Sequence, residues 1–187
     1  MTRIIEVDAH RLEKWVDGFA ARHDGVTSAV EPGRVLLVGG DGTRAVGETF
    51  EHERIGLVLV RRGGHAVGVD EGGELTSHKC GTRYVQSRTK AGGWSQQRYS
   101  RRRGNQADSV VTTVAELACK HLPPGRVDAL VLGGDRKLAE QVLTDPRLAH
   151  LRDLERRTLW NLPDPRLSVL KDAARRARAV RLTLDDE

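Results

Sequence analysis

The chain has 187 residues, and its 31 basic and 26 acidic residues give it a formal net charge of +5. This length suits one sizeable core with a small appendage and excludes three ordinary domains. Cys80 and Cys119 have no zinc-type spacing, so we expect reduced thiols, no bound metal and no cofactor. No apolar run approaches the roughly 20 residues of a membrane span. We therefore expect a cytoplasmic protein without membrane contacts.

The first 52 residues predict a small αββ unit. Apolar residues recur at helical spacing between Leu12 and Ala20, on what we expect to be one face of a helix. Residues 34–38 and 43–50 indicate two strands of a hairpin, with an Asp-Gly pair suited to the turn between them. We place a domain boundary here and expect a second, larger domain over residues 53–187.

Three more strands are predicted in the second domain. Residues 55–60 are continuously apolar, as a buried strand should be, and residues 65–69 and 74–85 follow after glycine-containing turns. Because the connections are short, we expect these strands to form an antiparallel meander. The meander leads into a glycine-rich, basic segment.

After that segment the chain alternates between helices and strands. A long helix is closed by Pro123-Pro124-Gly125, and a buried strand over residues 128–132 enters Gly133-Gly134-Asp135. Asp135 is better suited to cap the next helix than to bind an anion. The remaining elements are expected at residues 137–143 (helix), 148–156 (helix), 158–162 (strand) and 166–178 (helix). This order predicts an α/β or α+β fold, a mixed sheet with packed helices.

Charge is concentrated in one segment. Residues 75–107 carry eight Lys or Arg side chains and no Asp or Glu. Because this exceeds the net charge of the whole chain, the remaining residues are acidic on balance. A basic patch on an otherwise mildly acidic body is typical of nucleic-acid binding, and such binding weakens as the salt concentration rises.

The centre of the basic segment reads Gly92-Gly93-Trp94-Ser95-Gln96-Gln97. Ser95 is not in a nucleophile elbow, because Gln97 stands where the second glycine of that motif belongs. No carboxylate is near to act as a general base, so a catalytic role would rest on positioning and polarisation. The ester that joins a nascent peptide to tRNA suits this mode, since it is already activated and a glutamine amide can both donate and accept.

The run Arg88-x-Lys90-x-Gly92-Gly93-x-Ser95-x-x-Arg98-Tyr99-x-Arg101-x-Arg103 resembles the catalytic loop and following helix of eukaryotic and archaeal class I peptide-chain release factors. The order of elements is similar over roughly residues 55–185. Release factors carry glutamine where this chain has Trp94. Gly93-Trp94-Ser95-Gln96 instead resembles the loop of the ribosome quality-control peptidyl-tRNA hydrolases, the Vms-like release factors, which have small actinobacterial members.

This resemblance implies a codon-independent peptidyl-tRNA hydrolase that releases nascent chains from stalled ribosomes or large subunits. Gln96 is the implied catalytic residue, Gln97 is the alternative one position away, and Gly92 and Gly93 let the loop enter the peptidyl-transferase centre. The implied partners are the large ribosomal subunit, its ribosomal RNA and the CCA end of peptidyl-tRNA, bound by a monomer.

The RNA-contacting residues expected on this basis are Arg88, Lys90, Trp94, Arg98, Arg101, Arg102 and Arg103. A non-catalytic ribosome- or RNA-binding module of the same fold is the alternative hypothesis. Release of peptide, or salt-sensitive ribosome binding without release, distinguishes the two.

Overall fold

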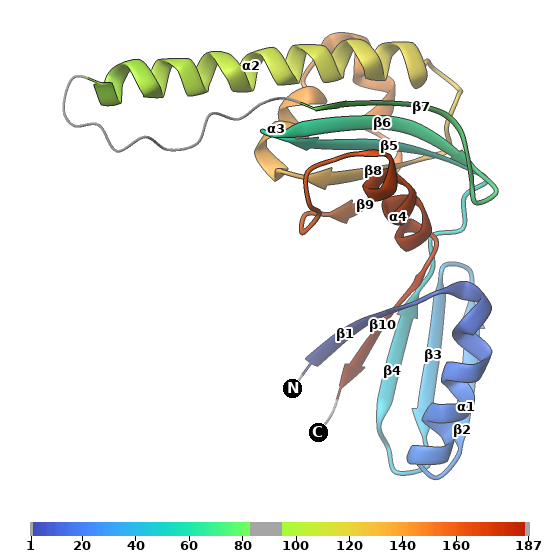
Figure 1. The fold of residues 1–187 in the computed structure, drawn as a ribbon. Helices are drawn as coiled ribbons and strands as arrows, with labels where there is room; N and C mark the ends of the chain where they lie inside the picture. Colours follow the sequence, from blue (N-terminus) through green and yellow to red (C-terminus); the bar gives the residue numbers. More distant parts are fainter. Residues whose placement is uncertain (1, 83–94, 186–187) are drawn as a thin grey trace. The chain divides into compact units, whose positions relative to one another are not determined.

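The structure is a computed structural model that describes the backbone of residues 2–82 and 95–185, and the side chains of residues 3–82 and 108–185. The chain divides into two compact units, residues 1–51 with 175–187 and residues 52–174 (Figure 1). Each unit contains a five-stranded sheet with helices packed on it. This combination confirms the predicted α+β class.

The first unit has an antiparallel sheet with strand order β1-β10-β4-β3-β2. Its strands are β1 (Thr2–Val7), β2 (Val26–Glu31), β3 (Arg34–Gly39), β4 (Arg44–Glu48) and β10 (Val180–Asp185). A short 3₁₀ helix, η1 (Ala9–Arg11), leads into α1 (Leu12–Arg22). The fully buried Phe19 of α1 packs against Val35, Leu37 and Ala45 of the sheet.

The predicted helix and hairpin correspond to α1, β3 and β4. At the hairpin turn Gly42 has a φ of 90°, its N–H donates to the Gly39 carbonyl at 3.0 Å, and Asp41 Oδ1 accepts from the Thr43 N–H at 2.9 Å. Strands β1, β2 and β10 were not predicted. The C-terminal β10 belongs to this first unit because it pairs with both β1 and β4.

The second unit has a mixed sheet with strand order β7-β6-β5-β8-β9. Its strands are β5 (Arg54–Arg61), β6 (Gly64–Glu71), β7 (Glu74–Thr82), β8 (Ala129–Gly134) and β9 (Glu155–Leu159). Strands β5, β6 and β7 form the predicted antiparallel meander, whereas β5, β8 and β9 are parallel. Since β7 also runs in the direction of β5, the four strands β5, β7, β8 and β9 all finish at the same end of the sheet, called the carboxyl end below.

Helices cover both faces of this sheet (Figure 1). One face carries α2 (Ser95–His121), α3 (Arg136–Val142) and a 3₁₀ helix, η2 (Pro146–Leu151); the other carries α4 (Leu167–Ala177). Val58 and Leu130 of the strands pack against Val114 of α2 and Leu138 of α3. On the α4 side, a Cβ built on Gly68 would lie 3.2 Å from Leu170 Cδ2. Burial of both faces explains why β5 is continuously apolar.

Two predicted elements lie earlier in the chain than expected. The helix expected at residues 148–156 is η2, and the strand expected at 158–162 is β9, which ends at Leu159. Residues 160–164 therefore follow the sheet as a loop. This shift gives the carboxyl end of the sheet a wall that the sequence did not predict.

Candidate functional site

The predicted catalytic loop leaves the second unit at the carboxyl end of its sheet. Thr82, the last residue of β7, pairs with Gly64, which in turn pairs with Arg61 at the end of β5. The chain is described again from Ser95, the first residue of α2. The loop is thus attached to a strand end on one side and to a long helix on the other.

The predicted site residues fall into two groups. Arg88, Lys90, Gly92, Gly93 and Trp94 lie outside the described residues. The others lie in the first three turns of the α2 backbone, where Gln96 and Gln97 are the second and third helical residues and Arg98, Arg101, Arg102 and Arg103 follow.

Helix α2 is held by its second half. With 27 residues it is about 40 Å long, more than the roughly 26 Å of the eight-residue β5, so its first half extends past the sheet (Figure 1). Val110, Val114 and Ala118 are buried against the core. At its end, Ser77 Oγ of β7 lies 2.7 Å from His121 Nδ1. The predicted glutamines therefore lie in the first turn of a helix whose second half is packed against the core.

Lys79 of β7 is the first cation of the basic segment, and it influences a neighbouring histidine at the end of α2. The pKa of His121 lies below its usual value of 6.5 because of burial and, secondarily, because Lys120, His78 and Lys79 repel a proton. Burial raises the pKa of the Cys80 thiol, which argues against a reactive thiolate at this position.

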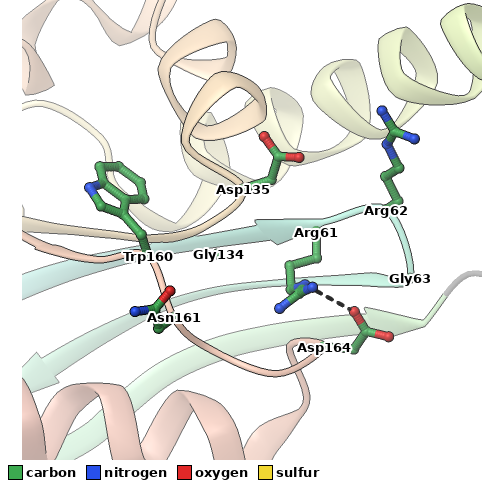
Figure 2. Close-up of a pocket in the computed structure, with 8 residues that line it drawn as sticks. All are labelled: Arg61, Arg62, Gly63, Gly134, Asp135, Trp160, Asn161 and Asp164. Atoms are coloured by element: carbon green, nitrogen blue, oxygen red, sulfur yellow. Dashed lines mark ion pairs between the residues drawn. The ribbon is translucent and has the colours of Figure 1, made fainter.

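A pocket of about 480 Å³ also opens at the carboxyl end of the sheet (Figure 2). It is lined by Arg61, Arg62, Gly63, Gly134, Asp135, Trp160, Asn161 and Asp164. The residues come from the ends of β5 and β8 and from the loop after β9, which is where open α/β sheets generally bind ligands. From the sequence, Gly134 and Asp135 were expected to form a strand end and a helix cap, and no pocket was predicted here.

Hydrogen bonds fix the walls of this pocket. Arg61 donates to the Leu162 carbonyl, and its Nε lies 3.3 Å from Asp164 Oδ1, so this arginine holds the loop after β9 (Figure 2). Asp135 Oδ1 accepts from the Leu138 N–H at 3.2 Å and the Asp135 N–H donates to the Val60 carbonyl at 2.7 Å. Asp135 is thus the N-cap of α3, as predicted.

At the opposite end of the sheet, an ion pair joins the starts of β5 and β8. Asp128 Oδ1 accepts from an Arg54 guanidinium nitrogen at 2.6 Å, and Oδ2 accepts from Arg54 Nε at 3.1 Å. This contact lowers the pKa of Asp128 and raises that of Arg54. We assign the pair a structural role, because it lies at the end of the sheet opposite to the pocket.

Neither a metal-ligand cluster nor a membrane-spanning helix is found among the described residues. Within residues 2–82 and 95–185, no group of three or more His, Cys, Asp or Glu side chains lies together as metal ligands would. The helices of that part of the chain include none long and apolar enough to cross a bilayer.

Comparison with known families defines the class of protein. Residues 53–183, well over half of the chain, match a family of release factors, so the protein has a release-factor role and acts at the ribosome. The chain belongs to the family described as Actinobacteria/chloroflexi VLRF1 release factor, acVLRF1. This membership confirms the resemblance found in the sequence. No curated protein matches the chain.

Proposed function

We propose that this release factor is a peptidyl-tRNA hydrolase in which Gln96 orients the water that attacks the ester between nascent peptide and tRNA. Membership of a release-factor family supports a role at that bond. The absence of any acidic residue between Leu75 and Ala107 supports a mechanism based on an amide rather than on a general base.

The position of Gln96 in the first turn of α2 carries the proposal. The first four N–H groups of a helix have no partner within it, and the partial positive charge at this end stabilises negative charge. A developing oxyanion would find donors there, while the glutamine amide orients water. Gly92 and Gly93 let the preceding backbone approach the ester closely.

Gln97 is the competing candidate. Successive residues of an α-helix are about 100° apart around its axis. Two neighbouring positions therefore face different directions, and we expect only one of the two glutamines to face the ester. We propose Gln96 because it ends the Gly93-Trp94-Ser95-Gln96 motif. Single substitutions at the two positions separate the candidates.

The basic residues would bind RNA. Arg98, Arg101 and Arg102 follow i, i+3 and i+4 spacing and therefore share one side of α2 by helical periodicity. A row of cations at this spacing suits a phosphate backbone. We propose that Arg103, Arg88, Lys90 and Trp94 complete the interface with ribosomal RNA and with the CCA end of tRNA.

We further propose codon-independent release on stalled ribosomes or large subunits, with residues 53–187 as the catalytic domain and residues 1–52 as an extension; the last strand of the former, β10, completes the sheet of the first unit. A non-catalytic ribosome-binding module remains the alternative hypothesis. The test is peptide release from purified stalled ribosome–nascent-chain complexes by the unaltered protein and by the Gln96→Ala and Gln97→Ala variants. Loss of release in the first variant supports the proposal, whereas full release by both variants rejects a glutamine mechanism.

A further inference from the structure

We propose that the pocket at the carboxyl end of the second sheet binds one ribonucleoside monophosphate unit, either as a free nucleotide or as an unpaired residue of single-stranded RNA. Its volume of about 480 Å³ falls within the usual range of roughly 300–1,000 Å³ for ligand pockets. The described residues that line the pocket lie outside the segment between β7 and α2, and the proposal does not depend on the hydrolysis proposed above.

One wall of the pocket suits a base. The half-buried Trp160 packs against the core, and the exposed Asn161 follows it directly (Figure 2). An indole face stacks on any base, and a side-chain amide can donate to and accept from the base edge. Figure 2 shows both residues at the same end of the pocket, at the start of the loop after β9.

The middle of the pocket suits a ribose. Asp135 uses its Oδ1 atom to cap α3, and its carboxylate is drawn between Trp160 and Arg62 in Figure 2. The second oxygen of this carboxylate can accept a hydrogen bond from a sugar hydroxyl. Because the 2′-hydroxyl distinguishes RNA from DNA, this contact would favour ribonucleotides.

The wall opposite Trp160 contains two arginines, Arg61 and Arg62, of which one is available to bind a single phosphate. Arg61 is already held by Asp164 and by the Leu162 carbonyl. The neighbouring Arg62 is exposed, points away from Arg61 in Figure 2, and has no ion pair within the described part of the chain. One available cation beside two carboxylates suits a monophosphate and disfavours a triphosphate.

The test is a titration of the full chain with adenosine 5′-monophosphate (AMP), followed by NMR at the Trp160 indole N–H and the Asn161 side-chain amide. Trp160→Leu assigns the indole signal and removes the stacking surface. We expect saturable shifts at both groups, about tenfold weaker binding in Trp160→Leu, and about fivefold weaker binding in both Arg62→Ala and Asn161→Ala. Arg11→Ala, which removes an exposed arginine of the first unit, should leave the affinity unchanged.

Two comparisons sharpen this test. Deoxyadenosine 5′-monophosphate should bind several-fold more weakly than AMP, and equal affinity would overturn the ribose contact. A pentamer of riboadenosine that binds more tightly than AMP and loses affinity in Asn161→Ala identifies RNA as the source, whereas equal binding of AMP and pentamer identifies a free nucleotide. Absence of shifts at Trp160 and Asn161 at millimolar AMP, or unchanged AMP affinity in both Asn161→Ala and Arg62→Ala, would overturn the proposal. Peptide release is measured separately, so failure here leaves the Gln96 hypothesis intact.

Discussion

Arg61 and Thr82 end two strands of the same sheet, and each pairs in register with Gly64, which lies between them. Arg61 lines the pocket, and Thr82 is the last described residue before the proposed catalytic loop. The carboxyl end of the sheet therefore carries two features at once, the pocket and the attachment of the loop. Changes that distort this end should affect both.

Gly134, at this end of the sheet, occupies a position where a side chain is disfavoured both by the backbone conformation and by steric overlap. It has a φ of 89°, and a Cβ added to it would overlap the Val60 carbonyl oxygen. Gly134→Ala should therefore lower the free energy of unfolding by about 2–4 kcal/mol, from backbone strain and steric overlap together. Urea unfolding followed by circular dichroism measures the decrease.

Gly125→Ala is the matched control for Gly134→Ala. Gly125 also has a positive φ, 76°, but nothing lies within 4 Å of an added Cβ. Gly125→Ala should therefore lower the free energy of unfolding by about 1 kcal/mol, from the unfavourable backbone conformation alone. Equal decreases in the two variants would show that the Val60 carbonyl does not matter.

The Arg54–Asp128 pair should contribute measurably to the stability of the second unit. Because Asp128 is partly exposed, we expect Asp128→Ala to cost about 1 kcal/mol. The solvent-exposed pair Arg136–Glu140, spaced i,i+4 on α3, provides the control: Glu140→Ala should cost about 0.3–0.5 kcal/mol. A smaller cost in Asp128→Ala than in Glu140→Ala would contradict the assigned role.

The same pair predicts a pH dependence. Arg54 lowers the pKa of Asp128 below 3.8, so the contribution of this carboxylate is complete above pH 3.8. It disappears as the pH falls through the lower, folded-state pKa. The difference in unfolding free energy between the unaltered protein and Asp128→Ala should accordingly shrink below about pH 3.8, as measured by urea titrations at several pH values.

His121 should titrate below pH 6.5, chiefly because it is partly buried and secondarily because cations are near. Removing one of these cations by Lys79→Gln should raise its pKa, and added salt should act in the same direction. NMR titration of the imidazole C–H signals checks both expectations. Since the folded-state pKa is lowered, stability should fall as the pH drops from 6.5, and less so in His121→Gln. A pKa of His121 above 6.5 would contradict the assigned environment.

RNA binding through α2 should depend strongly on salt. Replacing residues 101–103 by glutamine should lower the slope of log affinity against log salt by about 0.7–0.9 for each phosphate that the variant no longer neutralises. Fluorescence anisotropy with labelled ribosomal RNA fragments measures the slope. The matched control replaces three exposed cations of the first unit, Arg11, Lys14 and Arg22. Equal slopes in the two triple variants would remove α2 from the interface.

Local patterns predicted most of the second unit. Strand β5 was recognised from its unbroken apolar run, and the cap at Asp135 from its place between a strand and a helix. These features are encoded by residues close in the sequence, and the β5–β7 meander needs only short turns.

The missing elements depend on distant partners. β10 pairs with β1 and β4, which lie more than 130 residues earlier. No neighbouring turn or strand in the sequence therefore indicates that it belongs to a sheet. β2 lies at the edge of its sheet and is almost entirely exposed, which removes the apolar signal. The pocket was missed because its walls come from three separate segments and because β9 ends at Leu159 rather than at residue 162.

The most direct test of the central claim separates catalysis from binding. Ribosome binding is measured by co-sedimentation, and the single-turnover rate of peptide release is measured at saturating protein, for the unaltered chain, Gln96→Ala and Gln97→Ala. We predict that Gln96→Ala binds normally and releases peptide at least about 100-fold more slowly, whereas Gln97→Ala keeps most of its rate. A Gln96→Ala variant that binds and releases at the unaltered rate would contradict the account.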